Sequence, residues 1–304
     1  MRISEYRYGL DVKGQRGAAV CLGFFDGVHE GHRALIAECV SCAKENGLIP
    51  TVFTFPSESM SLKGGAPRIY STKDKLRLFE SLGIEHTVLA DFESVAALTP
   101  EEFADDVIIR DIGAKAALSG YSFRFGKGAS GDSELLSDML SKRNIEYVRV
   151  SDISIGGETV SSTRIREALT SGDLPTATLL LGEPYSLLGT VVHGDGRGHT
   201  FGYPTVNTEL SDSGLLPLGV YKTEAVIRGE VYTALTNVGV CPTFGIRERH
   251  AETLILDFSK DIYGDEVRIR FLEFLRGEKR FGSKDELIET IKKDIKRIKN
   301  GSMD

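Results

Sequence analysis

The hydrophobic rhythm of the chain changes near residue 184, and this change constrains the fold more than any other feature of the sequence. Before it, short apolar runs alternate with amphipathic stretches, which is typical of β-strands alternating with α-helices. The expected strands are 18–25, 49–55, 87–90 and 116–118, and the expected helices are 33–45, 72–82 and one that begins at the capping box 99–102. This alternation predicts a parallel sheet with helices on both faces, whose ligands bind beyond the carboxyl ends of the strands.

After Pro184 the pattern consists of strand-like runs separated by glycine turns, at 189–193, 220–227, 231–238, 253–258 and 267–274. A closed antiparallel barrel would bury one face of each run. The chain then ends in a helix that begins at the capping box 283–286 and carries an apolar stripe, which should pack against the barrel. The stripe consists of Leu287, Ile288, Ile291, Ile295 and Ile298. We therefore expect two domains in the 304 residues, 1–184 and 185–304.

The composition excludes several classes of partner. The net charge is −7, from 37 basic and 44 acidic residues, and no block of Lys and Arg suggests a nucleic-acid partner. The start of the chain has no apolar signal core and no apolar run reaches the length of a membrane span, so we expect no membrane partner and a cytoplasmic location. Cys39 and Cys42 have the spacing of a metal pair, but they lie in a helical run where cysteine usually acts as a small buried hydrophobe. Reduced thiols are the expected state.

The strongest signal in the first half is the glycine-rich sequence Gly23-Phe24-Phe25-Asp26-Gly27-Val28-His29-Glu30-Gly31-His32, which follows the first buried strand and leads into a helix. Glycine lets the backbone approach a nucleotide, and the amino end of the helix offers free N–H groups to phosphates. His29 and His32 should lie on the same side of the first turn and donate hydrogen bonds to a reacting phosphoryl group. Either histidine alone would be interpreted as a capping side chain, whereas the whole pattern favours a nucleotide site.

This sequence resembles the H-x-G-H nucleotidylyltransferase superfamily, and within it the prokaryotic bifunctional riboflavin kinase/FMN adenylyltransferases, also called FAD synthetases. The segment 160–166 is similar to the second motif of the family, I-S-S-T-x-I-R. The resemblance implies that His29, His32 and Arg166 are catalytic. It also implies a set of ATP-binding residues at the adenylyl site, namely Gly23, Phe24, Asp26, Gly31, Ser162 and Thr163.

The loop Gly120-Tyr121-Ser122-Phe123-Arg124-Phe125-Gly126 resembles the flavin-side loop of the same family. The resemblance implies that Ser122 and Phe125 contact the flavin, with Phe125 stacked on the isoalloxazine ring. Two departures fall on this side of the site. Ser122 replaces the usual Asn or Asp, and 54–59 lacks the His-Pro often found after that strand.

The second half contains no Walker loop, but 193–207 resembles the G-F-P-T-x-N motif of the riboflavin kinase barrel, with Tyr203 replacing Phe. The resemblance implies that Gly202, Pro204, Thr205 and Asn207 bind ATP and that Thr205 and Asn207 hold Mg²⁺. Without the family resemblance, the residue types of Pro-Thr-x-Asn would predict a turn in a loop. Glu252 matches the proposed general base of the family, which would accept the proton of the riboflavin hydroxyl. Leu254 replaces the usual histidine beside it.

Taken together, the resemblance implies a Rossmann-like parallel-sheet nucleotidylyltransferase domain followed by a riboflavin kinase-like antiparallel β-barrel with a terminal helix. The implied function is phosphorylation of riboflavin to FMN and adenylylation of FMN to FAD with release of pyrophosphate. Riboflavin, FMN and ATP are then the partners, Mg²⁺ the cofactor and ATP the co-substrate. The sequence makes no prediction of oligomeric state. Three alternatives stay open, namely a riboflavin kinase with a degenerate first half, an RNA-linked adenylating enzyme, and a flavin carrier without turnover.

Overall fold

The computed structural model describes residues 1–9, 17–59, 66–192, 205–210, 215–243, 246–279 and 281–299, with the backbone alone described at 205–210, 241–243 and 246–250. The chain forms two compact units, Met1–Ser162 and Thr163–Asp304. We call them the first and the second unit. Among the described residues, no helix is both long and apolar enough to cross a membrane.

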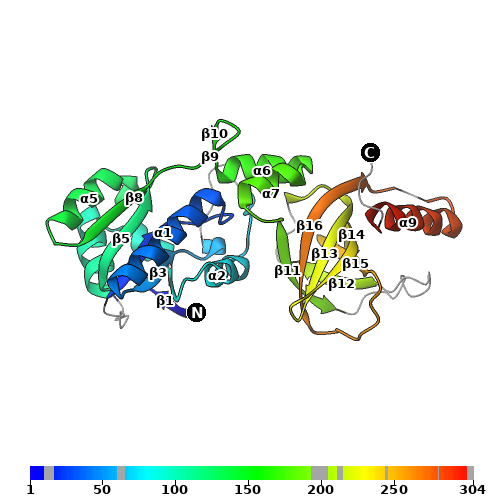
Figure 1. Cartoon of the computed structure of the whole chain (residues 1–304), viewed down its shortest axis with the longest axis horizontal. Coiled ribbons are helices and arrows are strands. Elements are labelled where there is room, and N and C mark those ends of the chain that lie inside the picture. Colours follow the sequence, from blue (N-terminus) through cyan, green and yellow to red (C-terminus); the bar gives the residue numbers. More distant parts are fainter. Residues whose placement is uncertain are drawn as a thin grey trace. The chain divides into compact units, whose positions relative to one another are not determined.

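The first unit contains a six-stranded sheet in the order β1-β4-β3-β2-β5-β8, and every pair of neighbouring strands is parallel (Figure 1). The strands are β1 (Arg2–Tyr6), β2 (Ala18–Leu22), β3 (Ile49–Thr54), β4 (His86–Ala90), β5 (Ala114–Gly120) and β8 (Glu146–Val150). The chain runs outward in one direction from β2 through β3 to β4 and in the other from β5 to β8. The carboxyl ends of β2 and β5 therefore flank a topological switch point, the place where such sheets bind ligands.

Helices cover both faces of this sheet. On one face, α1 (Glu30–Asn46) packs on β2, and the Cys39 thiol donates a hydrogen bond to the Ala19 carbonyl at 3.3 Å. On the other face, Val20 and Leu22 belong to an apolar core that includes Phe103 and Leu136. These come from the π-helical segment η3 (Phe103–Asp111) and from α5 (Ser133–Ser141). The βαβ rhythm of the sequence is thus confirmed as a doubly covered parallel sheet.

The remaining elements of the first unit are short. They are the helical segments η1 (Ser57–Ser59), α2 (Thr72–Ser81), α3 (Phe92–Ala96), α4 (Pro100–Glu102) and η4 (Lys127–Ala129), and the strands β6 (Arg124–Phe125), β7 (Gly131–Asp132), β9 (Ser154–Ile155) and β10 (Glu158–Thr159). The capping box expected at Thr99 is present. The Thr99 hydroxyl accepts a hydrogen bond from the Glu102 N–H at 3.1 Å, and the Glu102 carboxylate accepts one from the Thr99 N–H at 2.8 Å.

The second unit begins at the second residue of α6 (Ser162–Ser171) and continues with α7 (Leu174–Leu181). A closed antiparallel barrel follows in the order β11-β12-β15-β14-β13-β16 (Figure 1). The barrel strands are β11 (Ser186–Val192), β12 (Thr205–Leu210), β13 (Gly219–Ile227), β14 (Glu230–Thr243), β15 (Ile246–Ile255) and β16 (Glu266–Gly277). The expectation of a closed barrel is confirmed. One strand, β12, carries the Pro-Thr-x-Asn sequence from Thr205 onward, so the turn interpretation of that segment is wrong.

The two faces of the barrel wall differ in character. One face buries three threonines, and their hydroxyls form a chain from Thr223 to Thr236 at 2.8 Å and from Thr236 to Thr253 at 3.0 Å. The other face packs against the terminal helix α9 (Lys284–Lys299), which contributes Ile291, Ile295 and Ile298 to an apolar cluster with Val220, Leu235 and Leu254. The predicted packing of the helix on the barrel is confirmed for these three isoleucines. At the start of the helix, the Ser283 hydroxyl accepts a hydrogen bond from the Glu286 N–H at 3.2 Å, which is one half of the expected capping box, and the Glu286 carboxylate accepts one from the Gly282 N–H at 3.0 Å.

Candidate active sites

The turn after β2 is held in an unfavourable backbone conformation. Phe25 and Val28 have φ values of 55° and 41°, in the left-handed region that costs a non-glycine residue roughly 1–2 kcal/mol. Both side chains are buried. The Phe25 ring packs edge-on against Phe79 of α2, with centroids 5.5 Å apart, and against the His32 ring at 5.2 Å. Apolar packing therefore keeps the turn in the shape that places the two histidines.

The two histidines of the turn are stacked, with ring centroids 3.7 Å apart and ring planes within 16°. His29 is the N-cap of α1, where its Nδ1 accepts a hydrogen bond from the His32 backbone N–H at 3.4 Å. A Cβ at Gly31 would lie 3.3 Å from the His29 ring, so glycine leaves room for this cap. Because Nδ1 accepts, the proton of a neutral His29 ring is on Nε2, where it can be donated to a ligand. His29 is thus a capping residue that keeps a free donor.

Burial keeps both rings neutral. It lowers the pKa of His29 to about 4. Burial also lowers the pKa of His32 well below its ordinary value, and the neighbouring His29 and Lys75 lower it further. At neutral pH each ring can therefore donate one hydrogen bond without carrying a charge. The His32 Nδ1 is buried and has no hydrogen-bond partner among the described residues.

The second motif meets the first through a hydroxyl. Ser162 donates a hydrogen bond from its Oγ to the Asp26 carbonyl at 2.8 Å, which joins segments 136 positions apart. Asp26 is buried, and its carboxylate accepts a hydrogen bond from the Ile69 N–H at 3.1 Å. These contacts join Ser162 of the second motif to the turn that carries the histidines, within the first unit.

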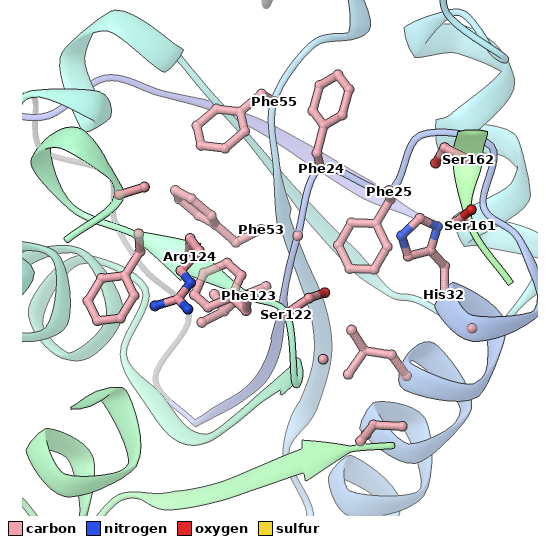
Figure 2. A pocket seen from close by; sticks show the side chains of 18 of the residues that line it. Phe24, Phe25, His32, Phe53, Phe55, Ser122, Phe123, Arg124, Ser161 and Ser162 are labelled. Atoms are coloured by element: carbon pink, nitrogen blue, oxygen red, sulfur yellow. The ribbon is translucent and has the colours of Figure 1, made fainter. Parts of the chain in front are cut away.

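A cavity of about 880 Å³ opens at the carboxyl ends of β2 and β5, within the first unit (Figure 2). Figure 2 shows His32, Ser161 and Ser162 on one side, Phe53, Phe123 and Arg124 on the other, and Ser122 between them. One end thus offers polar groups and the amino end of α1. The other end is aromatic. A ligand with phosphates at one end and a planar ring system at the other matches this division.

The aromatic end is formed by phenylalanines from four segments, namely 53–55, α3, η3 and the loop 120–126. The residues are Phe53, Phe55, Phe92, Phe103, Phe123 and Phe125. The Phe125 ring lies 5.3 Å from Phe103 and is stacked on Phe123 at 5.8 Å, with planes within 12°. A Cβ at Gly131 would approach the Phe125 ring to 2.6 Å, so this glycine is required for the ring position. The position of the Phe125 ring at this end of the cavity is therefore fixed without a ligand.

Most of the adenylyl-site residues expected from the sequence line this cavity, namely Gly23, Phe24, His29, Gly31, His32, Ser122, Phe125 and Ser162. Asp26 does not line it and acts through the Ile69 and Ser162 contacts instead. Thr163 and Arg166 lie on α6 in the second unit, within the first two turns after Ser162. The phenylalanines contributed by β3, α3 and η3 could not be identified as site residues from the sequence, because apolar residues in such segments also form ordinary cores.

In the second unit, a row of polar residues crosses three barrel strands. Glu252 on β15 lies opposite Asn207 on β12 and opposite Asn237 on β14 in the strand register. Directly opposite residues on antiparallel strands have Cβ atoms about 4.5–5.5 Å apart, on one face of the sheet. Glu252 and Asn237 are half-buried. The register therefore brings together two of the residues predicted for the kinase site, Asn207 and Glu252, and adds Asn237.

Other residues predicted for the kinase site are only partly described. Gly202 and Pro204 lie outside the described residues, and for Thr205 and Asn207 the strand position is described without the side chains. Leu254, which stands in place of the family histidine, belongs to the apolar cluster beneath α9. The substitution thus gives the terminal helix an apolar contact two positions from Glu252. Asn237 was missed as a partner because its pairing with Glu252 depends on strand register.

The first unit therefore has the features of a nucleotide-transferring enzyme, with donors at a helix amino end and a long cavity at a topological switch point. Comparisons with known proteins agree. A family model described as FAD synthetase matches residues 11–164, and one described as riboflavin kinase matches residues 181–301.

Whole-chain relatives carry the same pair of activities in their names. The chain is 36% identical over 289 residues to the bifunctional riboflavin kinase/FMN adenylyltransferase of Bacillus subtilis, which covers 92% of this chain and 91% of the relative. It is 33% identical over 300 residues to the protein of the same name from Escherichia coli, with coverage of 97% and 96%. The chain belongs to the bifunctional riboflavin kinase/FMN adenylyltransferase family.

A solved structure has the same fold throughout. The crystal structure titled a macrolide-efflux protein from Streptococcus pneumoniae superposes with a TM-score of 0.87 and 32% identity. The match covers 99% of this chain and all of that one. This similarity shows that the parallel-sheet unit and the barrel unit occur together in another single chain.

Proposed function

We propose that the chain makes FAD in two steps, with one reaction in each half. The second half, 185–304, phosphorylates riboflavin to FMN, and the first half, 1–184, adenylylates FMN. The family models support this division, since the FAD synthetase match ends at 164 and the riboflavin kinase match begins at 181. The observation that carries the proposal is the cavity of the first unit, which combines neutral buried histidines with an aromatic end.

In adenylyl transfer, a phosphate oxygen of FMN attacks the α-phosphorus of ATP, the bond to the bridging oxygen breaks, and pyrophosphate leaves. His29 and His32 donate hydrogen bonds to the charge that develops on the α-phosphoryl oxygens. Gly23, Phe24, Gly31 and the N–H groups at the start of α1 bind the nucleotide, with Ser162 and Thr163. Arg166 stabilises the departing pyrophosphate. Ser122 and Phe125 orient the flavin.

In riboflavin phosphorylation, the primary hydroxyl of riboflavin attacks the γ-phosphorus of ATP and ADP leaves. Glu252 accepts the hydroxyl proton, and Gly202, Pro204, Thr205 and Asn207 bind the nucleotide. The alignment of Asn207 with Glu252 supports one site for both roles.

Mg²⁺ fits the donors available on β12. Thr205 and Asn207 are two positions apart, on one face of the strand, and offer the neutral oxygen ligands that Mg²⁺ accepts while it keeps waters and substrate phosphates. When bound, the metal would neutralise charge on the ATP phosphates. Cys21, Cys39 and Cys42 are buried free thiols, which supports the proposed cytoplasmic location.

The test is chromatography of the products formed when the purified chain is incubated with riboflavin, ATP and Mg²⁺. FMN should appear first and FAD second, with pyrophosphate released only in the second step. FMN that accumulates without FAD would favour a riboflavin kinase with a degenerate first half. Absence of both products would favour a flavin carrier.

A further inference from the structure

Helix α2 carries a lysine that is buried behind the adenylyl site. Lys75 has only 1% of its surface exposed. Its Nζ donates hydrogen bonds to the carbonyl oxygens of Phe24 at 2.9 Å and Phe55 at 3.0 Å. Burying an ammonium group is costly unless it is paired or hydrogen-bonded. Lys75 is the one buried lysine among the residues that the structure describes, and it lies directly behind the turn that follows β2.

The two carbonyls belong to segments that line the cavity. Phe24 is in the turn after β2 and Phe55 follows β3, and both side chains line the cavity (Figure 2). Lys75 is not among the residues that line it. The Phe24 carbonyl also accepts a hydrogen bond from the Thr54 hydroxyl at 3.1 Å. The Lys75 Nζ lies 4.5 Å from the centroid of the Phe24 ring. Lys75 thus joins two strand-end loops from outside the space that a ligand would occupy.

The joined turn is the one that places the histidines. Left-handed conformations at Phe25 and Val28 persist only where surrounding contacts hold them. Helix α2 supplies two such contacts, since Lys75 binds the Phe24 carbonyl and Phe79, one turn later, packs against the Phe25 ring. The Phe25 ring in turn contacts His32. A chain of direct contacts therefore runs from α2 to a histidine of the site.

The ammonium also contributes charge. Its field lowers the pKa of His32, after the larger effects of burial and His29. Burial lowers the pKa of Lys75 itself to about 8, the negative charges of Asp26 and Glu58 oppose this decrease, and Arg68 adds to it. Lys75 is therefore mostly charged at pH 7 and loses its charge as the pH rises through about 8.

We propose that Lys75 is a positioning residue for adenylyl transfer, which fixes the Phe24–Phe25 turn beneath the nucleotide and places a positive charge behind the phosphate-binding end of the cavity. The inference rests on the proposed function of the first unit. It adds to that function a residue that belongs to neither of the two sequence motifs and touches no substrate.

The experiment compares Lys75→Met and Lys75→Arg with the wild-type chain, and FAD formation from supplied FMN and ATP is measured between pH 6.5 and 9.5. Lys75→Met should lower kcat/KM for ATP by on the order of 10²-fold at pH 7, because small displacements of reacting groups have effects of this size. Lys75→Arg should recover at least about a third of the wild-type value. Riboflavin phosphorylation by the same molecules should stay within about twofold, and circular dichroism and thermal unfolding show whether the first unit of each variant is folded.

The pH profile separates a charge effect from a purely structural one. In the wild type, kcat/KM should fall as the pH rises through about 8, because the free enzyme loses the Lys75 proton. In Lys75→Arg this fall should be absent, because guanidinium stays protonated. Lys73→Met is the matched control, since Lys73 is exposed on the same helix, and it should behave as wild type.

The outcomes distinguish the two proposals. If the wild type forms FAD and Lys75→Met forms it equally fast, the role of Lys75 is overturned and the function of the site stands. If Lys75→Met and Lys75→Arg lose FAD formation to the same extent and the pH profiles of kcat/KM all have the same shape, the proposed role of the Lys75 charge is overturned. If the wild type forms no FAD from FMN at any pH, the proposed adenylyl transfer itself fails.

Discussion

The cavity of the first unit and the row formed by Asn207, Glu252 and Asn237 in the second unit hold their polar groups in different ways. In the first unit, the groups lie on loops and helix starts beyond the strand ends, and buried side chains such as Phe25 and Lys75 fix them. In the second unit, Asn207, Glu252 and Asn237 lie within strands, so the barrel ladder sets their spacing. A loop site therefore depends on residues outside its motif, whereas a strand site depends mainly on correct strand pairing.

The most severe test of this comparison removes the histidine pair. His29→Ala combined with His32→Ala should abolish FAD formation, because loss of one preorganised donor typically costs on the order of 10²- to 10³-fold in rate. Riboflavin phosphorylation should persist within about twofold, and both rates are measured by product chromatography. Loss of both reactions in protein that circular dichroism shows to be folded would mean that the two reactions share one nucleotide site.

The reciprocal substitution is Glu252→Gln, which keeps the shape of the side chain and removes the base. Riboflavin phosphorylation should fall by at least on the order of 10²-fold, the usual contribution of general base catalysis. Conversion of supplied FMN to FAD should continue at the wild-type rate. Asn207→Ala should give the same pattern, and a variant that loses only FAD formation would reverse the assignment of the two sites.

A third prediction concerns stability and pH. Because the pKa of His29 is about 4 in the folded chain and about 6.5 when unfolded, the unfolded state binds more protons between these values. This contribution to the free energy of unfolding is therefore complete above pH 6.5 and decreases as the pH falls toward 4, by about 2 kcal/mol at pH 5. Urea denaturation followed by circular dichroism should show that His29→Asn loses less stability than wild type between pH 7.5 and 5. If both proteins lose the same free energy of unfolding between pH 7.5 and 5, the His29 side chain is exposed to solvent and its pKa is not lowered by burial.

The smallest expected effect is at the flavin end. Ser122 lines the cavity, and its side chain reaches less far than Asn. Ser122→Asn should lower the apparent KM for FMN in FAD formation by up to about tenfold, or ~1.4 kcal/mol, the scale of one hydrogen bond to a polar ligand group. Steady-state kinetics with varied FMN measure this change, and Ser130→Asn in the nearby loop serves as the matched control. An unchanged KM would mean that residue 122 does not reach the flavin.

The sequence predicted the elements whose apolar periodicity is strong and missed those whose burial is decided by pairing. Strand β2 is entirely buried and was expected, whereas β1 is mostly exposed and polar and was not. Strand β12 was missed because Thr205 and Asn207 follow a glycine-rich segment, and its ladder partners come from other strands.

The predicted site shows the same division. Motif residues such as His29 and Ser162 could be identified because their spacing within a short segment has a chemical meaning. Lys75 lies 51 positions from Phe24, on a helix whose charged residues are typical of a solvated face. Its contact with the turn follows only from the packing of α2, which the sequence pattern does not determine.

The threonine chain inside the barrel has a consequence for misfolding. Side chains alternate between the two faces of a strand, so a slip of one residue between β14 and β15 would turn Thr253 outward and leave its hydroxyl partner unmatched in an apolar interior. The same slip would turn Glu252 into that interior and separate it from Asn207 and Asn237. Three hydroxyls that touch no substrate thus penalise the mispaired barrels in which the carboxylate would be on the wrong side of the wall.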